Sequence, residues 1–194
     1  MLLYSHGGGG ARAFEGSKPE GLASHGFLVV TMDHADAFAT ILPDGSLLPG
    51  ILERNATRSD QRDKDVQFMM TALGELNAGD PLFAGRLDLE RMGVFGFSWG
   101  GATAFNVCKL DGRCKAAVDM DGSFIWQGGT QSDNHGAFLL QAPVNKPVMI
   151  LQSSAPDEPQ FEQFFNLQTH DAYLLRIDGI THGNFGEIAL LPQV

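Results

Sequence analysis

One short run of residues constrains the fold of this chain more than any other. An apolar stretch at residues 92–97 leads into a serine between glycines, and residues 96–100, GFSWG, fit the pattern Gly-x-Ser-x-Gly. In this pattern a strand turns sharply into a helix and presents the serine hydroxyl at the turn, where larger flanking side chains would collide with backbone. We therefore predict a nucleophile elbow at Ser98, although a chain with 24 glycines can also match the pattern by chance.

The residues around this serine favour the elbow over an ordinary glycine turn. Residues 92–97 fit a short buried strand, and the small and apolar residues between 102 and 107 suit a helix that packs closely on a sheet. The amide of Trp99 would lie at the start of that helix, where it can stabilise a negatively charged oxygen. We expect Ser98 to be a nucleophile and Trp99 to supply one amide of an oxyanion hole.

A glycine-rich segment near the start of the chain predicts the second oxyanion amide. Residues 2–4 are apolar and fit a strand, which runs directly into the segment HGGGG at residues 6–10. A strand that ends in His-Gly-Gly-Gly is typical of the oxyanion loop of α/β-hydrolases, where side chains would block the substrate carbonyl. The alternative is a flexible glycine linker. We predict Gly8 as the donor, with Gly9 as the second choice and as part of the substrate pocket.

Strand and helix patterns alternate along the whole chain. Further strands are predicted at residues 27–32, 115–121, 147–151 and 172–177, and helices at residues 19–25, from 59 onwards and around 161–167. The helix that starts near residue 59 carries an apolar stripe of core residues, Val66, Met69, Met70, Leu73 and Leu76. The alternation predicts one α/β domain over residues 1–194, with a mostly parallel sheet, helices on both faces and the α/β-hydrolase fold.

Two stretches between these elements lack a periodic pattern. Residues 35–58 contain several proline and glycine turn signals and predict a long connection that forms one wall of a pocket. Residues 122–143 predict a loop or lid over the site. The aromatic residues Phe97, Trp99, Phe124 and Trp126 suggest an apolar acyl pocket, with packing in the core as the alternative.

A serine nucleophile needs a base within hydrogen-bond reach and an acid that orients this base. His182 follows the last predicted strand in a glycine-flanked loop and is the best candidate base, with His135 in reserve and a purely structural histidine as the alternative. The acid has three candidates, ranked Asp121, Asp157 and Asp119. Asp121 ends the strand that follows the elbow helix, whereas Asp157 follows the next strand, which is the more usual position in this fold.

The order of five segments resembles the platelet-activating factor acetylhydrolase family of the α/β-hydrolase superfamily, which includes the isoform II enzymes and the lipoprotein-associated phospholipases. These segments are residues 5–10, 22–30, 96–101, 119–122 and 181–185. The resemblance implies that Asp121 is the acid in preference to Asp157, that His182 is the base, and that Gly8 and Trp99 supply the oxyanion amides.

The same resemblance implies a serine esterase that needs neither a metal nor an organic cofactor. Its expected substrates are small-molecule esters with short acyl groups, or phospholipids with an sn-2 acetyl group, cleaved through an acyl-enzyme. The alternatives are a hydrolase of other esters or polyesters, and a catalytically silent α/β-hydrolase-like binding protein or truncated fragment. A truncated fragment is an alternative because the chain begins where the third strand of the fold is expected, so the first two strands have no counterpart.

Composition excludes some classes of function. A net charge of −10 without a basic run argues against nucleic-acid binding, and no apolar run is long enough to span a membrane. A transient contact with a lipid surface stays open. The first six residues do not resemble a signal peptide, so both a cytoplasmic and a secreted location stay open, as does the oligomeric state. Cys108 and Cys114 are either a disulfide or two packed thiols.

Overall fold

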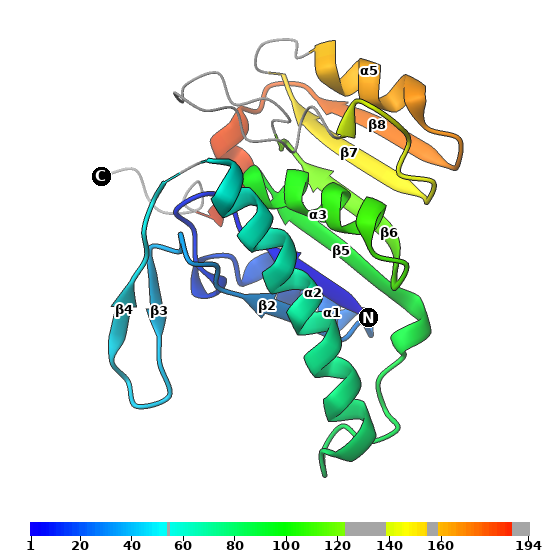
Figure 1. Ribbon diagram of the computed structural model, residues 1–194. Helices are drawn as coiled ribbons and strands as arrows, with labels where there is room; N and C mark the ends of the chain where they lie inside the picture. Colours follow the sequence, from blue (N-terminus) through cyan, green and yellow to red (C-terminus); the bar gives the residue numbers. More distant parts are fainter. Residues whose placement is uncertain (54, 123–138, 155–158, 188–194) are drawn as a thin grey trace.

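The computed structural model describes residues 1–53, 55–122, 139–154 and 159–187 (Figure 1). Its centre is a parallel sheet of six strands, in the order β2-β1-β5-β6-β7-β8. The strands are β1 (Leu2–Ser5), β2 (Val29–Met32), β5 (Met92–Phe97), β6 (Cys114–Met120), β7 (Val148–Ser153) and β8 (Ala172–Ile177). Each of them lies within a few residues of a predicted strand, so the predicted parallel sheet is confirmed.

Helices cover both faces of this sheet, as predicted (Figure 1). They are α1 (Ser17–Ser24), α2 (Ala56–Gly79), α3 (Trp99–Leu110) and α5 (Pro159–Leu167), with short 3-10 helices η1 (Arg12–Phe14), η2 (Leu89–Arg91) and η3 (His182–Phe185). Among the described residues, no helix combines the length and the apolar character needed to cross a bilayer.

The two sides of the sheet contribute to two separate cores. Successive residues of a strand face opposite sides, so Leu3 and Val94 pack in the larger core under α2, α3 and α5, whereas Tyr4 and Phe95 pack on the side of α1. In the larger core the rings of Phe105 and Phe164 stack with their centroids 4.8 Å apart. The predicted apolar stripe of α2 lies in this core.

The stretch predicted as a long connection, residues 35–58, has more structure than expected. It contains an antiparallel hairpin of β3 (Ala39–Ile41) and β4 (Leu47–Pro49), whose turn places Gly45 at φ +83°. It also contains the first turn of α2, which begins before residue 59 because the Asn55 side chain caps the helix by accepting a hydrogen bond from the amide of Arg58 at 3.0 Å.

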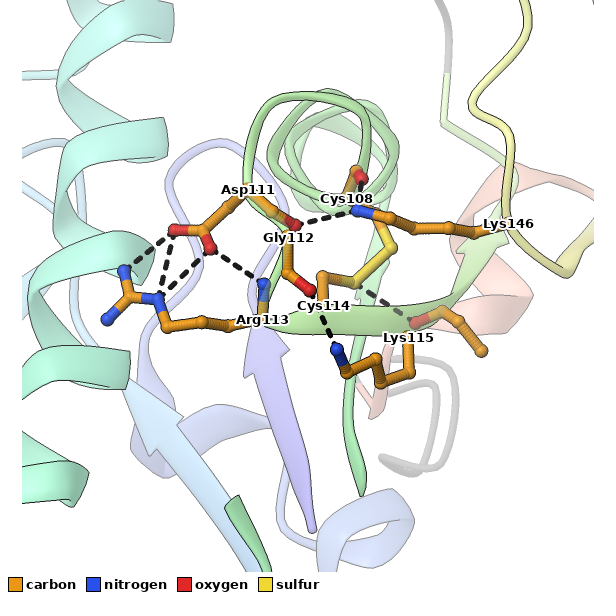
Figure 2. The surroundings of a disulfide bond; sticks show 8 residues. Cys108, Asp111, Gly112, Arg113, Cys114, Lys115 and Lys146 are labelled. Atoms are coloured by element: carbon orange, nitrogen blue, oxygen red, sulfur yellow. Dashed lines mark hydrogen bonds and ion pairs between the residues drawn. A yellow bond between two sulfur atoms is a disulfide. The ribbon is translucent and has the colours of Figure 1, made fainter. Parts of the chain in front are cut away.

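A disulfide joins Cys108 in the last turn of α3 to Cys114 at the start of β6 (Figure 2). The surrounding turn is further held by Arg113, which forms an ion pair with Asp111 at 2.7 Å, and by Lys146, which donates a hydrogen bond to the carbonyl of Asp111 at 2.7 Å. Of the two alternatives left open for these cysteines, the structure therefore shows the disulfide.

Candidate active site

Ser98 lies at the sharp turn between β5 and α3 and has φ 55° and ψ −124°. Few non-glycine residues adopt a positive φ, and such strain is found where the surrounding structure enforces it. A methyl group at Gly96 would lie 2.2 Å from the carbonyl oxygen of Gly100, and one at Gly100 would lie 2.0 Å from that of Ser5. Both flanking glycines are thus required by close backbone contacts, as a nucleophile elbow demands.

Three residues from distant parts of the sequence meet at this turn. The Nε2 atom of His182 lies 3.0 Å from the Oγ atom of Ser98, and the Nδ1 atom of His182 lies 2.8 Å from the Oδ2 atom of Asp121. Because the strands are parallel, the elbow after β5 and the residue after β6 lie at the same edge of the sheet, where η3 also brings His182. The hydrogen bonds form the continuous series Ser98, His182, Asp121.

The surroundings of Asp121 keep its carboxylate charged. Its side chain accepts hydrogen bonds from the amide and the hydroxyl of Ser153, at 2.6 and 2.9 Å. Burial opposes ionisation, but the hydrogen bonds from His182 and Ser153 outweigh it and hold the pKa of Asp121 below its ordinary value. Ser153 was not among the residues predicted from the sequence; the only signal was its position directly after a predicted strand.

The loop that carries His182 is closed by hydrogen bonds between its own residues. Asn184 accepts hydrogen bonds from the amide and the hydroxyl of Thr181, at 2.7 and 2.9 Å, which closes the single turn of η3 around the histidine. The ring of Phe97 lies 4.8 Å from the imidazole of His182, between centroids. Phe97, expected in the acyl pocket, thus supports the histidine from the β5 side. The His182 side chain is 51% exposed, so solvent and a substrate can reach it.

The glycine loop after β1 lies directly beside the elbow. A methyl group at Gly7 would lie 3.3 Å from Cβ of Ser98, and one at Gly8 would lie 3.3 Å from the ring of Trp99. Gly9 has φ +68° and lies against Leu52, which comes from the stretch predicted to form a pocket wall. The amide of Gly8 donates no hydrogen bond to another described residue. The loop therefore leaves this amide available for a bound oxygen.

Trp99 contributes its side chain to the core rather than to a pocket. Its ring is buried, and its Nε1 atom donates a hydrogen bond to the hydroxyl of Ser59 at 3.1 Å.

Asp119, the third candidate acid, is buried under the elbow and accepts a hydrogen bond from the amide of Gly122 at 2.7 Å. The predictions for Phe124, Trp126, His135 and Asp157 concern positions outside the described residues.

A second series of serine, histidine and aspartate lies behind the glycine loop. The Oγ atom of Ser5 lies 2.9 Å from Nε2 of His34, and Nδ1 of His34 lies 2.8 Å from Asp65. Ser5 has no exposed surface, and burial lowers the pKa of His34, so the imidazole stays neutral. His34 thus connects β1 to α2 in the interior of the protein, and no ester can reach Ser5.

The known proteins that are similar to this chain are named as ester hydrolases. The model of the family "Platelet-activating factor acetylhydrolase, isoform II" matches residues 1–43. A platelet-activating factor acetylhydrolase from Cavia porcellus is 24% identical over an alignment of 217 residues, gaps included, and this alignment covers 95% of this chain. The chain is similar in sequence to this family. A probable 1-alkyl-2-acetylglycerophosphocholine esterase from Arthroderma benhamiae is a further relative, 27% identical over 130 residues that cover 65% of the chain.

The fold is that of a solved esterase. A ferulic acid esterase from Streptomyces cinnamoneus superposes with a TM-score of 0.76 over 97% of this chain, at 26% sequence identity. The predicted α/β-hydrolase fold and the resemblance to the acetylhydrolase family are therefore confirmed. The chain spans 48% of the Cavia porcellus relative, 32% of the Arthroderma benhamiae relative and 54% of the ferulic acid esterase chain.

Proposed function

We propose that this chain is a serine carboxylic-ester hydrolase with Ser98 as nucleophile, His182 as general base and Asp121 as the acid that orients the histidine. The observation that carries the proposal is the unbroken series of hydrogen bonds from Ser98 through His182 to Asp121, with Ser98 at a strained elbow. A serine hydroxyl is a weak nucleophile at neutral pH, and this arrangement is the one that activates it.

In the proposed reaction His182 takes the proton of Ser98 as the Oγ atom attacks the ester carbonyl. The ionised carboxylate of Asp121 stabilises the imidazolium that forms, and it keeps Nδ1 protonated so that Nε2 is free to act as base. The same histidine then protonates the leaving alcohol, which leaves an acyl group on Ser98. Water, activated by His182, attacks this acyl-enzyme and releases the acid.

The negative charge on the substrate oxygen would be stabilised by the backbone amides of Gly8 and Trp99. Support for this role comes from the contact of Gly8 with the ring of Trp99, the residue directly after Ser98, and from the Gly8 amide, which donates to no other residue that the structure describes. Preorganised amides of this kind contribute a large part of the rate enhancement in acyl-transfer enzymes, about 2.7–4 kcal/mol for one donor.

For the substrate we propose short acyl esters, including the sn-2 acetyl group of phospholipids. Both relatives from the sequence comparison are named for acetyl ester substrates of this kind. The ferulic acid esterase with the same fold keeps other carboxylic esters as the second candidate, because the shape of the pocket rather than the triad selects the substrate.

Replacement of Ser98 tests the proposal directly. We expect Ser98→Ala to lower the kcat of p-nitrophenyl acetate hydrolysis by about 10⁴-fold or more, because no other group can accept the acyl moiety. Ser24→Ala, a change at an exposed serine of α1, is the matched control and should keep full activity. Full activity in Ser98→Ala would exclude the assignment.

Asparagine variants decide between the two remaining acids. We expect Asp121→Asn to lower kcat by about 10⁴-fold, since an amide holds the imidazole in the wrong tautomer, and Asp157→Asn to have little effect. The opposite result would assign the role of the acid to Asp157.

A fluorophosphonate probe separates an enzyme from a silent binding protein, because only an activated serine is labelled. A panel of acetyl to long acyl esters with one phospholipid would define the substrate.

A further inference from the structure

Arg62, near the start of α2, is a fully buried cation that no step of the proposed mechanism uses. Its side chain is 1% exposed. It is held by Asp36, also 1% exposed, through two parallel hydrogen bonds of 2.9 Å from Nε and 2.7 Å from Nη2. Ion pairs this deeply buried are not favourable merely as sources of stability, because both charges lose their hydration. We therefore ask whether the pair of Arg62 and Asp36 has a role in the active site, which its location would indicate.

The guanidinium of Arg62 contacts the peptide that carries the Gly8 amide and the ring of Trp99. On one side it donates hydrogen bonds to the carbonyl oxygens of His6 at 2.8 Å and Gly7 at 3.4 Å. On the other side its Cζ atom lies 4.4 Å from the centroid of the Trp99 ring, close enough for a cation–π interaction. One side chain thus lies between the glycine loop and the first residue of α3.

The contact with Gly7 bears directly on the amide of Gly8, because these two groups belong to one peptide unit. In a trans peptide the carbonyl and the amide point in opposite directions, and this bond is trans. The Gly7 carbonyl also accepts hydrogen bonds from Nδ1 of His6 at 2.6 Å and from the amide of Gly10 at 3.0 Å. These donors fix the carbonyl on the side of Arg62, so the Gly8 amide points away from the guanidinium.

The remaining members of the cluster hold the same loop. Asp36 accepts a hydrogen bond from the amide of Gly9 at 3.4 Å in addition to those from Arg62. Nε2 of His6 accepts a hydrogen bond from the amide of His34 at 3.2 Å, so Nδ1 carries the proton that is donated to Gly7. A protonated Nδ1 cannot also accept a hydrogen bond from Nη2 of Arg62, which lies 3.4 Å away. The groups that the cluster holds on either side of Gly8 are therefore the Gly7 carbonyl and the Gly9 amide.

We propose that Arg62, oriented by Asp36, is a positioning residue of the oxyanion hole: it fixes the peptide that carries the Gly8 amide and braces the ring of Trp99. This inference rests on the proposed function, since it assigns a task to a hole that an esterase would use. A cation at the Gly7 carbonyl also polarises the shared peptide and so strengthens the Gly8 amide as a donor.

Kinetics distinguish this role from a merely structural one. An oxyanion hole acts on the transition state more than on the bound ester, so a displaced Gly8 amide should lower kcat and leave KM nearly unchanged. A residue that only stabilises the fold would lower the fraction of folded protein and leave the kcat of that fraction as it was.

The first experiment compares Arg62→Lys with Arg113→Lys. Both changes keep the charge and remove the two-point contact with an aspartate, but Arg113 binds Asp111 and α2 far from the glycine loop. With kcat expressed per folded molecule from circular dichroism, we expect Arg62→Lys to lower the kcat for p-nitrophenyl acetate about 10–100-fold with KM within about threefold, and Arg113→Lys to match wild type. An unchanged kcat in folded Arg62→Lys would overturn the inference.

Two further measurements cover the case in which Arg62→Lys does not fold. Asp36→Asn keeps the shape of the side chain and should lower kcat in the same selective way. In the wild-type protein, the hydrogen-bonded backbone amides of Gly9 and Gly10 should exchange with deuterium at least about tenfold more slowly than those of the exposed hairpin turn at 42–46. Exchange at equal rates would overturn the inference without any activity measurement.

The outcomes separate this inference from the proposed function. A wild-type protein that hydrolyses no ester and is not labelled by the fluorophosphonate would show that the proposed function is wrong. An active wild type whose Arg62→Lys and Asp36→Asn variants keep full kcat would show that only the assignment of Arg62 is wrong.

Discussion

Glycine 100 illustrates how a single missing side chain permits the active-site turn. A methyl group at this position would lie 2.0 Å from the carbonyl oxygen of Ser5 and 2.7 Å from that of His6. Neither oxygen can move away without displacing the end of β1 and the start of the glycine loop. The approach of α3 to this loop therefore depends on glycine, although the position lies inside a helix, where glycine is otherwise unfavourable.

Alanine substitutions in two helical glycines test this interpretation. We expect Gly100→Ala to lower the free energy of unfolding by about 3 kcal/mol or more, because backbone would have to move. Gly74→Ala in α2 has open space around the new methyl group and should raise stability by about 0.5–1 kcal/mol. Urea unfolding of both variants measures the difference, and equal effects would contradict the role of the close contact.

The sequence was informative about residues whose position follows from the fold. Ser98 and His182 follow predicted strands and Asp121 ends one. Parallel strands deliver such residues to one edge, where the structure brings the three within hydrogen-bond distance. Ser153 also comes after a predicted strand, but neither Ser153 nor Arg62 could be singled out by position alone. Their importance lies in contacts with residues 26 to 57 positions away, which no local pattern encodes.

At the scale of elements, strands and helices were predicted well and their boundaries less so. Long apolar runs define β5 and β7 because a central strand is buried on both faces. The hairpin β3–β4 was missed since its strands are only three residues long and mostly exposed, which leaves turn residues as the dominant signal. The cap at Asn55 similarly lies within a polar stretch that reads as a loop.

The disulfide between α3 and β6 is a testable link between elements. It closes a short loop, and the chain-entropy estimate for a loop of this size gives about 2 kcal/mol of stabilisation. We therefore expect the Cys108→Ala/Cys114→Ala double variant to lose about 2 kcal/mol in urea unfolding. Its KM and kcat should stay at wild-type values, because the link lies at the opposite end of α3 from Ser98. A changed kcat would show that the link also shapes the elbow.

For the whole molecule, the buried histidines predict loss of stability in mild acid. Burial, aided by the charge of Arg62, lowers the pKa of His6 to about 3, and burial also lowers the pKa of His34. Unfolded histidine has a pKa of about 6.5. As the pH falls below that value, the unfolded chain binds protons that the folded protein does not, so the stabilisation present at neutral pH is lost progressively toward the folded-state pKa.

Urea unfolding at several pH values measures this effect. His6 should contribute up to about 1.4 kcal/mol of lost stability per pH unit between pH 6 and pH 4, and His34 should add to the loss in the same direction. Below about pH 4 the carboxylates of Asp36 and Asp121 add to the loss, because their pKa values are lowered in the folded state. His25→Gln, a change at an exposed histidine, should leave the slope as it is. A flat profile from pH 6.5 to 4.5 would contradict the prediction.

The buried series of Ser5, His34 and Asp65 has the same residue types and order of contacts as the exposed series of Ser98, His182 and Asp121. The corresponding distances agree to within a tenth of an ångström. A search that compares only interatomic geometry would report two catalytic centres in this chain. What separates them is access, since a reagent meets Ser98 at the surface and cannot penetrate to Ser5. A covalent inhibitor of serine hydrolases should consequently modify this protein with a stoichiometry of one.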